Sequence, residues 1–195
     1  MKKSILLLIA YFTILHLNAQ SSKREEGIQF GLKAGLNASN FSGDLKDNKM
    51  RNGLHIGLVT EIIISDKFSL QPELLYSAQG YKDETPDAFS KQKFDYLNVP
   101  VLVKYYVANN LSIEGGPQVG YLLNAITRDN DGNTSIPEQS KVDFGVDLGL
   151  SYELTSGVFF QGRYNLGITN VNAASNASAF TYANSVFQLS VGCFF

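Results

Sequence analysis

The stretch Val142-Asp143-Phe144-Gly145-Val146-Asp147-Leu148-Gly149-Leu150-Ser151-Tyr152-Glu153 alternates an apolar residue with a small or charged one, without a break. A period of two places these two sets of residues on opposite faces of a β-strand. The stretch therefore predicts a strand with one apolar face and one face of Asp, Gly, Ser and Glu.

Seven further segments of the 195-residue chain show this alternation, at residues 28–36, 54–64, 68–78, 97–106, 111–121, 160–168 and 186–195. Three of the links between segments are short, at 65–67, 107–110 and 155–157. The other four links are long and polar, at 38–52, 82–94, 123–140 and 171–183. Short links at one end and long links at the other predict an up-and-down antiparallel meander of eight strands.

The composition of the polar face indicates whether this face points into the barrel or outward. This face interleaves glycines such as Gly35, Gly57 and Gly149 with ionisable residues. Glycine weakens a strand, so it has little use on a solvated outer face, whereas a narrow lumen needs small residues. Tyrosines near the ends of the apolar set are typical of the interfacial girdles of membrane barrels. The alternative is a soluble barrel with its apolar face inside.

We therefore predict an all-β fold: an eight-stranded antiparallel up-and-down transmembrane β-barrel with short periplasmic turns and long extracellular loops. The predicted lumen-facing polar network consists of Lys33, His55, Glu61, Glu73, Lys104, Glu114, Asp143, Asp147, Glu153 and Arg163. Its three cations and six carboxylates can neutralise one another as a structural plug. The alternative interpretation of these charges is a narrow, cation-selective pore.

The N-terminus indicates export. Lys2 and Lys3 precede an apolar run at 5–17, and Ala19 offers a small residue for cleavage, which is the order of a secretory signal peptide. We predict a signal peptide over residues 1–19 and a barrel domain over 20–195, located in the outer membrane. The slight excess of acidic residues, 18 against 16 basic, argues against a nucleic-acid partner.

The C-terminus indicates closure of the barrel. The last predicted strand places its apolar residues on one face: Phe187, Leu189, Val191, Cys193 and Phe195. Most soluble domains end in a frayed, polar tail, whereas a strand that runs to a final Phe is typical of one that must pair completely. We predict that it pairs with 28–36 and closes the barrel. The single cysteine, Cys193, excludes an internal disulfide.

The segments 70–77 (LQPELLYS), 96–105 (YLNVPVLVKY), 115–122 (GGPQVGYL), 143–153 (DFGVDLGLSYE) and 163–168 (RYNLGI) follow one another along the chain. In sequence and in order they resemble the PorT-like outer membrane β-barrel family. The resemblance implies an eight-stranded outer-membrane barrel that tolerates Pro72, Pro100 and Pro117, although each proline removes a ladder donor. It also implies that the outer-membrane insertion machinery recognises the last strand, so that Phe187, Leu189, Val191 and Phe195 belong to an assembly strand. It transfers no functional motif at the level of residues.

We predict no catalytic residue, cofactor or metal site. A Ser-His-Asp set that joins His55 to Asp143 or Asp147 has no local signature in the sequence, so we interpret His55 as a lumen histidine bonded to a carboxylate. Asp129, Asp131 and Glu138 have a calcium-loop-like spacing. Their first ligand position is not acidic and their flanks are predicted strands, so we interpret this loop as a solvated turn.

The expected function is structural or interaction-based. We expect a monomeric barrel, set in outer-membrane lipid, that braces the membrane or presents its loops to an unknown binding partner. A narrow transport pore is the alternative from another functional class, and an outer-membrane enzyme is a third.

Overall fold

Long antiparallel strands dominate the structure, a computed structural model that describes residues 26–43, 48–85, 88–128, 134–135, 140–168 and 182–195. The strands are β1 (Gly27–Gly43), β2 (Asn48–Ile63), β3 (Phe68–Thr85), β4 (Ala88–Ala108), β5 (Leu111–Arg128), β6 (Thr134–Ser135), β7 (Val142–Glu153), β8 (Val158–Gly167) and β9 (Tyr182–Phe194). β6 is a two-residue strand that pairs with the end of β5. Within these ranges, no helix has the length and hydropathy needed to cross a membrane.

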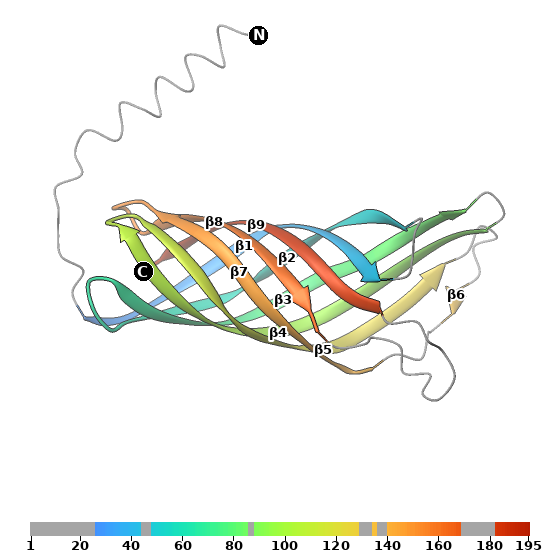
Figure 1. Cartoon of the computed structure of the whole chain (residues 1–195), viewed down its shortest axis with the longest axis horizontal. Helices are drawn as coiled ribbons and strands as arrows, with labels where there is room; N and C mark the ends of the chain where they lie inside the picture. Colours follow the sequence, from blue (N-terminus) through green and yellow to red (C-terminus); the bar gives the residue numbers. More distant parts are fainter. Residues whose placement is uncertain (1–25, 44–47, 86–87, 129–133, 136–139, 169–181) are drawn as a thin grey trace, which may run out of the picture.

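In the part of the chain that the structure describes, the eight long strands close into a barrel (Figure 1). β4 pairs with β5, and β1 pairs with both β2 and β9, so the sheet of long strands has no free edge. Following the register once around the wall from Ile28 leads back to β1 at Ala38, ten residues along. This stagger tilts the strands relative to the barrel axis. The predicted fold and the pairing of the last strand with the first are confirmed.

The two faces of the wall are inverted relative to a soluble protein. Apolar residues of the alternating set lie on the outside, as Leu148 (55 % exposed) and Leu189 (54 % exposed) illustrate. Charged residues such as Lys33 and Arg163 lie inside and are almost completely buried. The predicted orientation of the faces is therefore confirmed, and the outer face is suited to lipid.

The three short links lie at one end of the barrel, which we call the turn end; the opposite end is the loop end. Gly157 adopts a φ of 82° in the link between β7 and β8, a left-handed conformation that favours glycine. At the loop end, the prediction of long links at 38–52 and 82–94 is wrong. β1 and β2 continue to Gly43 and from Asn48, and β3 and β4 continue to Thr85 and from Ala88. Backbone pairing continues there because it does not require an apolar face.

The prolines interrupt the ladder without shifting it. Pro72 pairs with Val101, and the register between β3 and β4 is the same on both sides of it. Pro100 and Pro117 likewise occupy ladder positions in β4 and β5. The register shifts lie elsewhere, between Met50 and His55, between Asp95 and Tyr96, and between Tyr106 and Ala108. A missing donor therefore weakens the pairing locally, while the side chains keep their faces.

Candidate functional site

The lumen is filled by pairing glycines with large residues on the next strand. Gly35 pairs with His55, and Gly192 pairs with Phe159. A Cβ atom added to Gly192 would lie 2.2 Å from the Phe159 ring, and one added to Gly35 would lie 2.7 Å from the His55 ring. The large side chain thus folds over the glycine beside it. This pairing explains why the polar face is rich in glycine.

Arg163 of β8 spans the lumen to Glu73 of β3. Arg163 Nη2 donates to Glu73 Oε1 at 2.7 Å, and Arg163 Nη1 donates to Glu73 Oε2 at 3.0 Å. β3 and β8 are four strands apart in the closed order of the eight long strands, so this pair joins opposite walls. Two parallel charge-assisted hydrogen bonds fix its geometry. Both side chains are fully buried.

A second set of contacts crosses the lumen between β1 and β5, which are also four strands apart. Lys33 Nζ donates to Gln161 Oε1 at 2.7 Å, and Gln161 Nε2 donates to Glu114 Oε2 at 2.9 Å. Lys33 Nζ also lies 2.8 Å from Glu73 Oε2, which joins the two crossings. We call the five residues Lys33, Glu73, Glu114, Gln161 and Arg163 the cross-brace.

Asp147 of β7 flanks the cross-brace. Its Oδ2 lies 3.6 Å from Arg163 Nη1, and its Oδ1 accepts a hydrogen bond from Asn165 Nδ2 at 2.8 Å. With Asp147 included, three carboxylates surround two cations at this level. Buried charges are stable only when they are paired and hydrogen-bonded. Both cations are paired here, and Asp147 is hydrogen-bonded through Oδ1 but not through Oδ2.

A second charged cluster lies nearer the turn end. Glu61 of β2 accepts hydrogen bonds from Lys104 Nζ at 2.9 Å, from Tyr106 Oη at 2.5 Å and from Ser69 Oγ at 2.6 Å. The carboxylate therefore has a cation and two hydroxyl donors. All four side chains belong to residues that are almost completely buried.

A group of apolar residues, which we call the floor, lies beside this second cluster. Phe159 and Phe194 stack with their ring centroids 4.7 Å apart, and Val59 packs with them in a buried group. Lys104 Nζ lies 5.7 Å from the centroid of the Phe194 ring, within the range of a cation–π contact. The lumen is thus filled by charged residues at one level and by aromatic residues at another.

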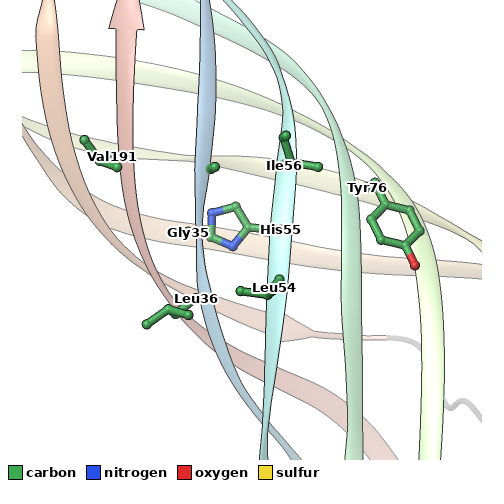
Figure 2. Close-up of a pocket in the computed structure, with 8 residues that line it drawn as sticks. Gly35, Leu36, Leu54, His55, Ile56, Tyr76 and Val191 are labelled. Carbon is green, nitrogen blue, oxygen red and sulfur yellow. The ribbon is translucent and has the colours of Figure 1, made fainter.

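His55 lies in a third, uncharged group. Its Nδ1 lies 2.7 Å from Asn37 Oδ1, and its Nε2 lies 2.8 Å from Ser190 Oγ. The predicted carboxylate partner is wrong: an amide and a hydroxyl take its place. Gly35 stands in register between Ser190 and His55. Because Gly35 has no side chain, the imidazole ring lies over it (Figure 2). Its Nε2 can therefore reach Ser190 on β9, beyond β1.

The series Ser190, His55 and Asn37 has the connectivity of a nucleophile, a base and an orienting group. Ser190 faces the lumen and is 8 % exposed. Asn37 Oδ1 also accepts a hydrogen bond from Gln188, and Asn37 Nδ2 donates to Ser77. These residues are packed and hydrogen-bonded as a group, which is how the structure of a polar core is maintained. We therefore assign them to the lumen network.

The remaining two predicted network residues lie away from these clusters. Asp143 is half-buried near the loop end of β7, where it lies beside Gly120. Glu153 is half-buried at the turn end of β7, and its backbone bonds with Asn110. The prediction missed the neutral members of the network, among them Asn37, Gln161 and Ser190. Their signal was present, because they alternate in phase with the charged residues.

The outer wall over His55 carries an apolar groove of about 530 Å³ (Figure 2). Besides Gly35 and His55, it is lined by outward-facing residues of β1, β2, β3 and β9: Ala34, Leu36, Leu54, Ile56, Tyr76 and Val191. Its lining belongs to the apolar outer face, and the polar atoms of His55 bond on the other side of the wall. The groove therefore belongs to the lipid-facing surface.

In the described part of the chain, no three His, Cys, Asp or Glu residues are arranged so that they could hold a metal ion. Asp129, Asp131 and Glu138 of the calcium-like loop lie outside the described residues, as does the predicted signal peptide at 1–19.

Residues 18–172 match the family model described as the outer membrane protein beta-barrel domain. The chain belongs to that family. No curated protein matches the sequence. The family and the barrel together place the protein in the outer membrane, as predicted. The PorT-like label within this family stays a prediction.

Solved outer-membrane barrels share the fold. Ail, the attachment invasion locus protein of Yersinia pestis, solved with the heparin analogue sucrose octasulfate, is 14 % identical with a TM-score of 0.56, covering 88 % of this chain and 100 % of Ail. Neisserial surface protein A is 19 % identical with a TM-score of 0.56, covering 87 % of this chain and 100 % of that protein. At such identities the likeness establishes the fold alone.

Proposed function

We propose that the protein is a closed outer-membrane scaffold whose lumen is plugged and whose work is done at its outer surface. It braces the membrane or presents its loop end to a binding partner. The observation that supports this proposal is the cross-brace, in which Arg163–Glu73 and Lys33–Gln161–Glu114 join opposite walls at one level. The proposal leaves no role for catalysis.

The energetics favour a plug over a pore. An ion that passed the cross-brace would have to separate buried, hydrogen-bonded charge pairs, and breaking such a pair costs about 3–5 kcal/mol. The stacked rings of Phe159 and Phe194 form a second barrier, because they offer an ion no hydrogen bonds to replace its water. Eight strands also leave an interior that side chains just fill.

Three further parts of the proposal concern assembly. The signal peptide is cleaved after Ala19, the mature barrel is a monomer, and its last strand is recognised by the insertion machinery. The outward placement of Phe187, Leu189, Val191 and Phe195, each between 46 % and 81 % exposed, supports the role of an assembly strand that contacts lipid and its insertion partner. We also propose that the protein is PorT-like within its family.

Single-channel recording tests the plug. The refolded mature protein, reconstituted in a planar lipid bilayer, is expected to give no steady unitary conductance. Steady, ohmic unitary steps from the unmodified protein would overturn the proposal and favour the narrow pore.

A matched pair of variants checks that the recording can detect an opening. Phe159→Gly faces Gly192 in the register, so it leaves two glycines side by side and removes the stacked ring from the floor. Phe160→Gly removes an outward ring from the next position of β8. We expect more frequent openings from F159G than from F160G.

A further inference from the structure

Asp143 of β7 is a lumen carboxylate that has no cation beside it in the described part of the chain. Four other lumen carboxylates each lie within 3.6 Å of a buried Lys or Arg side chain: Glu61, Glu73, Glu114 and Asp147. The Asp143 carboxylate accepts a hydrogen bond from the backbone N–H of Phe144, but its buried Oδ1 accepts none. Buried charges in proteins are normally paired with an opposite charge or bound to a metal ion.

The register places Asp143 inside the barrel, next to a glycine. Its neighbours along β7, Val142 and Phe144, are 38 % and 52 % exposed on the outer face, so Asp143 between them faces the lumen. Asp143 pairs with Gly120 of β5, and Gly120 pairs on its other side with Asn98 of β4. The glycine therefore leaves the space above it to the side chains of the two neighbouring strands.

Three side chains meet above this glycine. A Cβ atom added to Gly120 would lie 2.8 Å from Asn98 Oδ1, 3.4 Å from the Tyr96 ring and 3.7 Å from Asp143 Cβ. The Tyr96 hydroxyl also lies within electrostatic range of the Asp143 carboxylate. Gln118 precedes Gly120 by two residues on the same face of β5, so it stands diagonally opposite both Asn98 and Asp143.

Four polar atoms around Gly120 have no hydrogen-bond partner in the described part of the chain: Tyr96 Oη, Asn98 Nδ2, Gln118 Oε1 and Asp143 Oδ1. Tyr96, Asn98 and Gln118 are only 1 %, 2 % and 7 % exposed, so bulk solvent does not satisfy them. Buried polar atoms without a partner are rare, and a group of them indicates a bound species. We call Tyr96, Asn98, Gln118 and Asp143 the Gly120 site.

The chemistry of the Gly120 site indicates a small cation. Asp143 supplies one negative charge, while the Tyr96 hydroxyl and the amide oxygens of Asn98 and Gln118 are neutral oxygen ligands. Hard cations prefer such oxygens. A water molecule bonds to the same atoms but does not neutralise the carboxylate. With one carboxylate, a monovalent cation leaves the site neutral, whereas calcium sites usually contain several carboxylates.

We propose that the Gly120 site binds one monovalent metal cation, such as sodium, between β4 and β7. These strands do not pair with each other, so the cation adds a link between them. On β5, Gly120 lies six residues beyond Glu114 of the cross-brace, toward the loop end. A cation from outside the cell therefore reaches the site without passing the cross-brace. The inference goes beyond the scaffold role, because it makes the stability of the outer end of the barrel depend on salt.

The test measures how unfolding depends on sodium. The full mature protein in non-ionic detergent micelles is melted in sodium chloride and in choline chloride at equal ionic strength, and circular dichroism follows the loss of strand structure. We expect sodium to raise the melting temperature by about 5 °C, in a saturable manner, because choline is too bulky to replace it. Equal melting temperatures in the two salts would overturn the inference, since water alone would then satisfy the site.

A matched pair of variants assigns the sodium effect to the site. Asp143→Asn removes its charge and is expected to abolish the difference between the two salts. Glu153→Gln removes the same charge from a half-buried position at the opposite end of β7, and it is expected to keep the difference. A sodium effect that persists in D143N, or one that both variants lose equally, would contradict a cation held by Asp143.

Two further substitutions test the ligands if D143N does not fold. Tyr96→Phe keeps the ring and removes the hydroxyl, so we expect about 10-fold weaker apparent affinity for sodium; unchanged affinity would overturn the site as defined. Gln118→Glu adds a second carboxylate, so we expect calcium to stabilise Q118E more than the unmodified protein. Stabilisation of the unmodified protein by calcium at lower concentration than by sodium would overturn the monovalent assignment.

The outcome is separable from that of the proposed function. D143N leaves the contacts of the cross-brace in place, so its channel recording is expected to match that of the unmodified protein. Stability that is independent of sodium, together with a closed lumen, overturns this inference alone. Steady conductance together with sodium-dependent stability overturns the plug alone.

Discussion

At the scale of single residues, Gly35 is one of the glycines that we expect to tolerate no side chain. A Cβ atom there would lie 2.0 Å from the carbonyl oxygen of Leu189 and 2.7 Å from the His55 ring. We predict that Gly35→Ala lowers the free energy of unfolding by about 1–3 kcal/mol, because the ring must leave its site beside Ser190. Urea-induced unfolding in detergent micelles, followed by gel mobility, measures this loss.

Gly162→Ala is the matched control for this substitution. Gly162 also lies within a strand, but a Cβ atom there would meet its nearest neighbour, a methyl group of Leu189, at 3.7 Å. Its expected effect is therefore small. A similar loss from both variants would show that the strain comes from the strand backbone and not from the pairing of Gly35 with His55.

The sequence predicts which residues face the lumen but not which of them meet. Period two places Lys33, His55 and Arg163 on the inner face without reference to any other strand. The contact between Arg163 and Glu73 depends on the stagger of the whole wall, which no local pattern encodes. The error over His55 has the same origin: the amide and hydroxyl that it bonds are ordinary polar residues until the register brings them together.

At the scale of structural elements, β3 and β8 are held together through Glu73. This carboxylate binds both Arg163 and Lys33, so Glu73→Gln leaves two buried cations without their shared anion. We predict a loss of about 3–5 kcal/mol in the free energy of unfolding. Asp66→Asn, in the exposed link between β2 and β3, is the control and is expected to change stability little.

A double variant separates the pair from the rest of the network. Arg163→Met in the Glu73→Gln background removes one of the two cations that Glu73→Gln leaves unpaired. The loss of unfolding free energy in the double variant is therefore expected to be smaller than the sum of the losses in the two single variants. Strict additivity of the two changes would mean that the cross-brace is not a coupled unit.

The last strand yields a prediction about assembly. Residues Val191 to Phe194 pair with β1, and Val191 to Cys193 also pair with β8. Deleting 191–195 would therefore leave donors and acceptors of both neighbours unpaired in lipid, where each costs several kcal/mol. We expect the truncated chain not to insert. Membrane fractionation and heat-dependent gel mobility measure this, and normal insertion of the truncated chain would contradict the role of β9 as the assembly strand.

The prediction located the centres of the strands better than their ends at the loop end of the barrel. In the lipid band, one face must be apolar, and the alternation is visible. Beyond that band both faces are polar, so the pattern disappears at 82–94 although β3 and β4 continue to pair there. The strand ends at the turn end are easier to locate from the sequence, because the apolar residues of the alternating pattern continue almost to the short links.

At the scale of the whole molecule, the outer face can be probed directly, because the chain contains no tryptophan. Leu148→Trp places an indole on the outer face of β7, and Ser156→Trp places one in the exposed link between β7 and β8. In vesicles with brominated acyl chains, we predict strong quenching of the first fluorophore and weak quenching of the second. Equal quenching at both positions would contradict the lipid-facing assignment.

Closure and strand order were predictable because they follow from local quantities. Link lengths alternate, each strand needs a partner on both sides in lipid, and the last segment has no partner except the first. The continuation of β1 to Gly43, of β2 from Asn48, of β3 to Thr85 and of β4 from Ala88 was not predictable, since these residues lack the pattern that marks a strand.

Because each of the glycines Gly57 and Gly192 is paired with a large residue on the next strand, the width of the lumen at that level depends on both residues of the pair. Gly192 leaves room that Phe159 occupies, and Gly57 leaves room that Leu75 occupies. A substitution that enlarges one residue of such a pair is therefore tolerated only if the other residue becomes smaller by a similar volume. Where one residue of a pair is already glycine, shortening the other leaves a void at that level of the lumen, and the cross-brace is then the barrier that remains.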